Sequence, residues 1–344
     1  MRIDYLLRLY HKINIPAIKY LGIMMLRFVG MRYLVVRMDT NYLCNLKCRM
    51  CYFSGSDIVT RKPMSLDFYD KIALNIFRKV RVLYLSCGAE PFMTRDFIEF
   101  IRIARKYKVP NISFVTNGTL LNEDKIKDIV ELGVNEVIIS LDGATAETYE
   151  KIRTGASFEC VVRNLRLFKD IKAKYATRLP HIRLNYLLMK STISEIDLFF
   201  NLIKDLNISS VNFREIIPFE TEDPEYYSRE SITNDMSTYC RVQDTIRRNA
   251  GKYGINVITS ISCRKQIKKH TYKRLECLFP WFSVVIENNG NFRPCLYHDP
   301  VGNFKNDSYW KVMDGAKMKG LKSSLLFRPK NSCLNICYNS TERF

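Results

Sequence analysis

The sequence predicts an α/β protein whose parallel sheet curves into a partial (β/α)6 barrel, with an amphipathic helical extension before it and a small cysteine-containing domain after it. Between residues 33 and 215, six short β-rich runs alternate with amphipathic helical stretches. Such alternation is typical of parallel strands joined by right-handed helical crossovers. Residues 1–32 and 277–344 lack this rhythm, so each is expected to form a separate unit.

The expected strands and helices of the barrel follow from hydrophobic periodicity. The predicted strands are 33–38, 82–86, 111–116, 136–141, 182–189 and 210–215, and the main predicted helices are 67–79, 96–106, 123–132, 158–173 and 193–206. We expect a core domain over 33–220, a connecting helical segment over 221–276 and a C-terminal domain over 277–344. In parallel barrels the chemistry sits at the carboxyl ends of the strands.

The extension over residues 1–32 is cationic and amphipathic. Asp4 is its single acidic residue, and after Pro16 apolar residues recur at helical spacing (Ile18, Leu21, Met25, Phe28). Two interpretations stay open: a peripheral anchor on the inner face of an anionic membrane, or helices packed on the main domain. No apolar run approaches the roughly 18 residues that span a bilayer. No signal-peptide cleavage site follows either, so a cytoplasmic location is expected.

Cysteine content and charge narrow the class of protein. The 344-residue chain has eleven cysteines. An odd number with clustered spacing favours metal ligation in a reducing cytoplasm over a disulfide framework. The 54 Lys and Arg residues against 35 Asp and Glu residues give a net charge of +19, which predicts an anionic partner or reflects a basic host proteome. Nucleic acid is not the expected partner, because no base-reading module accompanies the basic run 264–274.

Cys44, Cys48 and Cys51 form a C-x3-C-x2-C motif just after the first predicted strand. Three thiolates on one tight loop can hold three irons of a [4Fe–4S] cluster and leave the fourth iron open. A zinc site is the alternative, but it needs a fourth ligand that does not follow nearby.

Three further segments follow the next predicted strands. They read Ser-Cys-Gly-Ala-Glu-Pro at 86–91, Thr-Asn-Gly-Thr at 116–119 and Ser-Leu-Asp-Gly at 140–143, and a fourth segment, Lys-Ile-Arg-Thr-Gly, stands at 151–155. Together with the three cysteines, these segments resemble the motifs of the radical S-adenosylmethionine (SAM) superfamily. The resemblance covers roughly residues 33–215 and implies a TIM-like barrel that binds S-adenosyl-L-methionine.

The resemblance also implies a role for each candidate residue. Cys44, Cys48 and Cys51 would ligate the cluster, whose open iron SAM would chelate. The implied SAM-binding residues are Tyr52 near the adenine, Glu90 for the amino group, Arg153 for the carboxylate, and Asn117 and Ser140 at strand ends. An electron from a donor such as flavodoxin or ferredoxin would cleave SAM reductively to a 5′-deoxyadenosyl radical. That radical would abstract hydrogen from a substrate C–H bond.

A second cysteine constellation lies near the C-terminus. Cys277, Gly290-x4-Cys295 and Cys333-x3-Cys337 resemble SPASM and twitch domains, which are accessory modules of radical SAM enzymes. Four cysteines imply one auxiliary [4Fe–4S] cluster, and a zinc site of the same four thiolates is the alternative. The remaining cysteines are expected to be buried thiols. The alternative is that Cys240 or Cys263 donates hydrogen to a substrate radical.

The resemblance favours a peptide or protein maturase. The cationic extension favours a rival, the modification of a lipid, lipid-linked glycan or small metabolite at the membrane surface. Two readings of other classes are a non-catalytic metal-binding or electron-transfer protein and a zinc-dependent RNA-binding protein. Neither explains the ordered strand-end motifs.

Overall fold

A computed structural model of the chain describes residues 16–51, 62–216, 225–259 and 277–327. Its centre is a ten-stranded sheet in which eight neighbouring strands, from β10 to β9, are parallel and two added strands are antiparallel. In spatial order the strands are β12 (Gly302–Asn303), β11 (Asn291–Arg293), β10 (Ser283–Ile286), β1 (Leu34–Met38), β3 (Val80–Leu85), β4 (Asn111–Thr116), β5 (Glu136–Ser140), β7 (His181–Leu188), β8 (Ser210–Glu215) and β9 (Asn256–Thr259).

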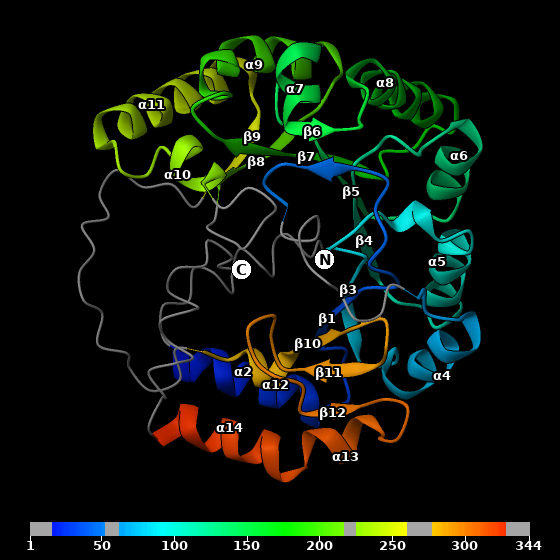
Figure 1. Cartoon of the computed structure of the whole chain (residues 1–344). Helices are drawn as coiled ribbons and strands as arrows, with labels where there is room; N and C mark the ends of the chain where they lie inside the picture. The colour runs from blue at the N-terminus through cyan, green and yellow to red at the C-terminus, as the bar shows by residue number, and fades with distance from the viewer. Residues whose placement is uncertain (1–15, 52–61, 217–224, 260–276, 328–344) are drawn as a thin grey trace.

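Helices surround this curved sheet on its outer side (Figure 1). The barrel helices are α4 (Leu66–Ile76), α5 (Phe97–Lys106), α6 (Glu123–Glu131), α7 (Ala146–Ile152), α8 (Phe158–Lys174), α9 (Ile196–Asp205), α10 (Tyr226–Glu230) and α11 (Met236–Tyr253). The others are α2 (Pro16–Phe28), α12 (Phe279–Phe282), α13 (Tyr309–Met313) and α14 (Ala316–Phe327), with 3-10 turns η1 (Pro91–Met93) and η2 (Ile193–Glu195). A small antiparallel ladder pairs β2 (Lys47–Cys48) with β6 (Arg153–Thr154).

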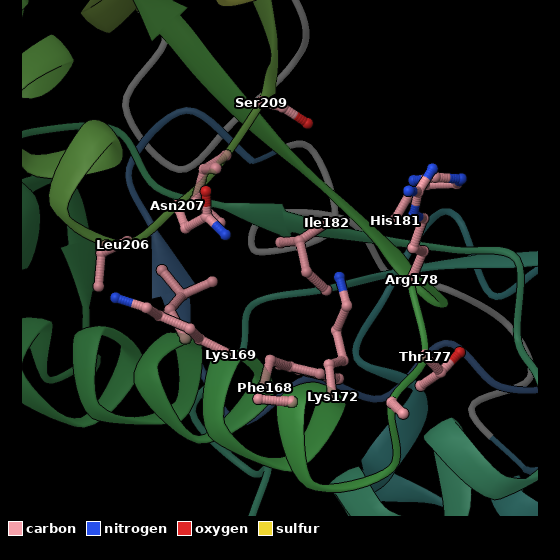
Figure 2. A pocket seen from close by; sticks show the side chains of 14 residues that line it. Phe168, Lys169, Lys172, Thr177, Arg178, His181, Ile182, Leu206, Asn207 and Ser209 are labelled. Atoms are coloured by element: carbon pink, nitrogen blue, oxygen red, sulfur yellow. The ribbon is translucent and has the colours of Figure 1, made fainter.

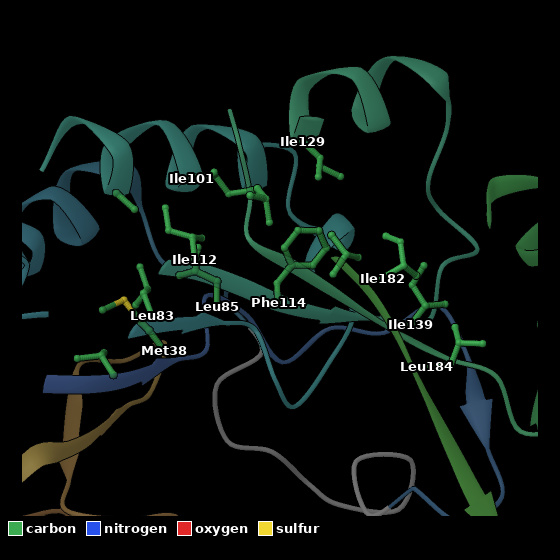
Figure 3. Packing of buried hydrophobic residues seen from close by; sticks show 14 of the residues in the cluster. Met38, Leu83, Leu85, Ile101, Ile112, Phe114, Ile129, Ile139, Ile182 and Leu184 are labelled. Atoms are coloured by element: carbon green, nitrogen blue, oxygen red, sulfur yellow. The ribbon is translucent and has the colours of Figure 1, made fainter. Parts of the chain in front are cut away.

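The predicted α/β class with a curved parallel sheet is confirmed. Each of the six predicted strands begins within two residues of the first residue of an observed strand. Alternating burial explains this agreement, because strands such as β7 bury every second side chain while their crossover helices bury one stripe. Figure 3 shows the result, with Leu83, Ile112 and Phe114 of the sheet packed beneath Ile101 of α5 and Ile129 of α6.

The C-terminal segment continues the same sheet. β10 lies parallel to β1, with Val36 opposite Val284, and all four of its residues are buried. The sequence pattern predicted no strand here. A buried run of four residues carries no alternation, and its partner β1 lies far away in sequence. The hairpin from β10 to β12 therefore extends the barrel sheet at its β1 edge.

Helix α2 packs one face on the C-terminal helices and exposes the other. Ile23 is buried, the ring of Tyr20 lies 5.5 Å from that of Trp281, and the Arg27 guanidinium lies 4.7 Å from the centre of the Trp310 ring. The predicted apolar stripe of Ile18, Leu21, Met25 and Phe28 faces solvent, with exposed fractions from 49% to 91%. No described helix combines the length and apolarity that crossing a bilayer requires.

Candidate functional site

A cavity of about 290 Å³ opens at the carboxyl ends of the barrel strands. It is lined by Cys44, Leu46, Cys48, Met50, Cys51, Cys87, Gly88, Ala89, Glu90, Val115, Thr116, Asn117, Ser140, Asp142, Arg153, Asn185, Leu187 and Arg214. The structure thus brings seven of the predicted site residues together: three cysteines, Glu90, Asn117, Ser140 and Arg153. Tyr52 lies outside the described residues.

The three cysteines occupy the loop between β1 and α4. Burial raises the pKa of Cys44, and it raises that of Cys48 to about 11 despite the opposing positive charge of Arg153. Two N–H groups approach the Cys44 sulfur. The Leu46 amide lies 3.5 Å from Cys44 Sγ, and Asn117 Nδ2 lies 3.9 Å from the same atom. Because both thiols hold their protons at neutral pH, binding iron must release them.

Arg153 and Asp142 form a buried ion pair beside Cys48. Arg153 Nε donates to Asp142 Oδ2 at 2.8 Å, and Nη2 lies 2.5 Å from the same oxygen. The other oxygen, Oδ1, accepts from the Leu187 amide at 2.8 Å. Arg153 Nη1 lies 3.8 Å from Cys48 Sγ, as the β2–β6 register places Cys48 opposite Arg153. Burial opposes the charge of Arg153, but the neighbouring Asp142 carboxylate raises its pKa above the ordinary value.

Glu90 joins the end of β3 to the end of β4. Its carboxylate accepts from Thr116 Oγ1 at 2.8 and 2.9 Å, from the Asn117 amide at 2.7 Å and from the Phe92 amide at 3.2 Å. The side chain is 1% exposed, and burial raises its pKa to about 7, against the lowering effect of these hydrogen bonds. All of these donors come from the protein, so the carboxylate holds the 86–90 loop in position.

A second carboxylate fixes the same loop from the β1 side. Asp39 Oδ1 accepts from the amides of Cys87 at 2.7 Å and Gly88 at 3.1 Å. Thr40 Oγ1 and Ser86 Oγ are 2.8 Å apart, and Ser86 has a φ of 50°, a left-handed value that non-glycine residues adopt rarely. The loop backbone is therefore held against the cavity from both sides.

Sequence reasoning missed four polar residues of this cavity: Thr116, Asp142, Asn185 and Arg214. Two of them lie within quoted motifs, and Asn185 and Arg214 lie toward the carboxyl ends of β7 and β8. Their position at strand ends was the available signal, because the inward-facing residue there borders the active face of a parallel barrel.

The C-terminal cysteines are only partly described. Cys277 precedes α12 and Cys295 follows β11, so the two flank the β10–β11 hairpin. Neither lines the 290 Å³ cavity. Cys333 and Cys337 lie outside the described residues.

The residues at the cavity fit a cysteine-bound cluster. Three thiols of one short loop line a single space, and N–H donors approach two of their sulfurs, as is common around iron–sulfur clusters. No three His, Cys, Asp or Glu side chains within the described ranges converge on one metal ion. In a [4Fe–4S] cluster each cysteine binds a different iron.

The fold and cavity define a barrel enzyme with a cysteine-lined cofactor site at the carboxyl ends of its strands. Comparison with known protein families identifies the family to which the chain belongs. Residues 39–203 match the radical SAM superfamily, and residues 277–339 match SPASM, an iron–sulfur cluster-binding domain. The chain belongs to the radical SAM superfamily and carries a SPASM domain. Its cofactors are accordingly a [4Fe–4S] cluster with SAM and an auxiliary iron–sulfur cluster.

Curated relatives that match this chain carry the name GTP 3′,8-cyclase. A probable GTP 3′,8-cyclase of Methanococcus maripaludis is 30% identical over 277 residues, which cover 76% of this chain and 85% of that protein. The GTP 3′,8-cyclase of Clostridium botulinum is 25% identical over 80% of this chain and 85% of its own. For a probable GTP 3′,8-cyclase from another Methanococcus maripaludis strain, the match spans 60% of that protein.

Solved structures share the fold at low sequence identity. Streptococcus suis SuiB bound to S-adenosylmethionine superimposes with a TM-score of 0.66 at 15% identity, over 90% of this chain and 72% of that one. The structure of anSMEcpe with bound AdoMet gives a TM-score of 0.64 at 18% identity, over 87% and 86%.

Proposed function

We propose that this chain is a peptide or protein maturase that abstracts hydrogen from a substrate C–H bond at the 290 Å³ cavity. The observation that carries the proposal is the meeting of the three-cysteine loop with three strand-end motifs and with Arg153 around that single space. Two structures of similar fold support a peptide substrate: SuiB was solved with its precursor peptide SuiA, and anSMEcpe with a bound peptide.

In this proposal Cys44, Cys48 and Cys51 hold the cluster. Bound SAM supplies the carbon radical that removes the hydrogen atom. Asn117 and Arg153 donate N–H groups toward the sulfurs, at 3.9 and 3.8 Å, and stabilise their negative charge once the thiols ionise.

The remaining site residues position or bind SAM. Glu90 acts through its neighbours, because its carboxylate is occupied and it fixes the 86–90 backbone that faces the SAM amino group. Arg153 still has N–H groups for the SAM carboxylate, Ser140 borders the same space, and Tyr52 lies directly after Cys51 in sequence.

For the auxiliary cluster we propose Cys277, Cys295, Cys333 and Cys337 as ligands. The matched SPASM region spans all four. Electrons would arrive from a flavodoxin or ferredoxin, whose acidic surfaces would suit a chain of net charge +19.

Cyclisation of GTP is the second candidate, favoured by the names of the curated relatives. A triphosphate requires several cations. Of the described residues at the cavity wall, Arg153 and Arg214 are the cationic ones, and Arg153 is paired with Asp142. The carboxylate of Asp142, together with Glu90 where it is ionised, offsets their charge. This balance favours an uncharged stretch of peptide over a triphosphate.

The first experiment tests the cofactor set. Iron, sulfide and 5′-deoxyadenosine are measured after anaerobic reconstitution and dithionite reduction, for wild type and for the Cys44→Ala, Cys48→Ala, Cys51→Ala triple variant. We expect about eight irons and SAM cleavage in wild type, and about four irons without cleavage in the variant. Cys160→Ala is the control, because Cys160 lies on α8 and does not line the cavity. Zinc in both sites with no cleavage would refute the proposal.

The second experiment separates the two substrates. The reconstituted enzyme is incubated with a perdeuterated peptide digest or with deuterated GTP, and 5′-deoxyadenosine is examined by mass spectrometry. Deuterium transfer from peptides alone supports the maturase. Transfer from GTP alone would assign the cyclase activity and overturn the first choice.

Membrane contact through α2 is a further proposal, motivated by its exposed stripe. Leu21, Met25 and Phe28 are 65%, 65% and 91% exposed, an unusual arrangement for one helix face. A bilayer with anionic lipids would cover this face and attract the basic chain. The triple variant Leu21→Ser, Met25→Ser, Phe28→Ser and the protein that lacks residues 1–32 should each show less cosedimentation with phosphatidylserine vesicles. Leu198→Ser, an exposed leucine of α9, should not. Unchanged binding of both altered proteins would exclude the anchor.

A further inference from the structure

A second pocket lies at the opposite end of the barrel from the cysteine loop. Its volume is about 560 Å³, within the range of small-molecule sites. The walls come from α8, from the segment between α8 and β7, and from the residues that lead from α9 into β8 (Figure 2). The two sites share strand β7: Ile182 at its start lines this pocket, and Leu187 near its end lines the cysteine cavity. Five residues of strand separate them by about 16 Å.

The floor of this pocket is apolar. Leu165 and Phe168 of α8 are buried, and Ile182, Leu206 and Ile208 complete a continuous hydrocarbon surface. Such a floor would accept an aliphatic or aromatic group, because covering its apolar surface removes that surface from water.

The rim is cationic. Lys169, Lys172, Arg178 and His181 contribute to the wall, and no acidic side chain lines it. In Figure 2, Lys172 extends from α8 toward Ile182, between the apolar floor and the rim. Lys169 Nζ donates to the Asp205 carbonyl at 3.4 Å, a long hydrogen bond.

Lys172 is half-buried without compensation from a neighbouring charge. Burial alone lowers the pKa of its ammonium group. Neither Lys172 nor Arg178 has an ion pair within the ranges of the chain that the structure describes. A partly desolvated cation above an apolar floor is the arrangement that an anionic ligand would stabilise.

We propose that this pocket binds a small amphiphilic anion, with its apolar body on Phe168 and Ile182 and its phosphate or carboxylate on Lys172 and Arg178. Three features carry this inference: the volume, the division between apolar floor and cationic rim, and the absence of acids from the wall. The site is separate from the SAM cavity and does not depend on the proposed substrate.

Octyl phosphate is the probe, titrated by calorimetry into the reconstituted full-length protein below its micelle concentration. We expect Lys172→Gln to weaken binding about 10-fold or more, because a hydrogen bond between charged groups is lost. Lys172→Arg should stay within about threefold of wild type, because it keeps the charge. Lys174→Gln is the matched control: Lys174 is also on α8 but does not line the pocket.

Two further ligands and one variant test the amphiphilic character. Octanol and inorganic phosphate should each bind at least about 10-fold more weakly than octyl phosphate, since each lacks one half of the interaction. Ala173→Phe, which fills the mouth from the exposed wall of α8, should abolish binding. Decanoate presents a carboxylate in place of the phosphate, and failure of both octyl phosphate and decanoate to bind wild type at millimolar concentration would overturn the proposal. Equal losses in Lys172→Gln and Lys174→Gln would do so as well.

Discussion

The guanidinium of Arg153 is paired with the carboxylate of Asp142, which is fully buried beneath it. The same guanidinium reaches Cys48 Sγ at 3.8 Å. One cation therefore neutralises a buried acid and approaches a thiol of the proposed cluster loop. Its roles in stability and in the site can be separated by mutation.

Arg153→Met should destabilise the fold by about 3–5 kcal/mol, because it leaves Asp142 buried and unpaired. Urea unfolding monitored by circular dichroism measures the change. Arg102→Met is the control: Arg102 pairs with Glu99 and Asp128, and all three side chains are at least about a third exposed, so its loss should cost less than about 1 kcal/mol. Equal costs for the two substitutions would mean that the buried pair contributes no more than a surface pair.

The double variant Arg153→Met, Asp142→Leu should recover most of the lost stability, because no buried charge remains. It should still reconstitute less SAM-binding cluster than wild type, because Cys48 has lost its nearby positive charge. The measurement is iron content alongside urea unfolding. If the double variant recovered both wild-type stability and wild-type iron content, Arg153 would have a structural role only.

The motifs that follow each strand were predictable from sequence because they are local. Short polar segments interrupt a regular strand–helix alternation, and parallel topology brings their positions to one edge. Asn185 and Arg214 were missed because each is a single polar residue inside a strand pattern, and a position near the carboxyl end of the strand was the one local signal that marked it as cavity-lining. Glu90 is a different case: its motif was recognised from sequence, but only the structure shows the three protein donors around its carboxylate.

The Glu90 carboxyl should make stability depend on pH. Its pKa rises from 4.5 in the unfolded chain to about 7 in the folded protein, mainly through burial. The folded state therefore holds this proton more tightly, and the associated stability is complete below pH 4.5 and is lost as pH rises through 7. The full loss is about 3 kcal/mol.

Thermal unfolding of cluster-free protein between pH 5 and 8 tests whether stability falls as the pH rises. Wild type should lose stability across the interval more steeply than Glu90→Gln, whatever the absolute stability of the variant. The cluster-free form is needed because a bound ammonium group would favour the ionised carboxylate. Identical slopes in the two proteins would rule out titration of Glu90 in this range.

The C-terminal part of the sheet shows a different limit of sequence reasoning. The pairing of β10 with β1 joins segments far apart in the chain, and no local pattern records such a contact. The glycine of the Gly290-x4-Cys295 motif, by contrast, was recognised only by resemblance, and the structure supplies its physical reason. Gly290 has a φ of +88°, and a Cβ there would lie 2.6 Å from Phe68 Cζ on α4.

Gly290→Ala should therefore destabilise the protein by about 2–4 kcal/mol, from left-handed backbone strain together with the clash against Phe68. Gly251→Ala is the matched control, because Gly251 is helical within α11 and a methyl group added there would meet no atom within 4 Å. That substitution should stabilise the protein by about 0.5–1 kcal/mol.

Phe68→Ala in the Gly290→Ala background distinguishes the two causes of the destabilisation. It should relieve the clash with Phe68 and leave the backbone strain at residue 290. If Gly290→Ala matched wild type in urea unfolding, the close approach of the hairpin to α4 would be wrong. If Phe68→Ala gave no relief, the backbone conformation of residue 290 would be the whole reason that glycine is needed there.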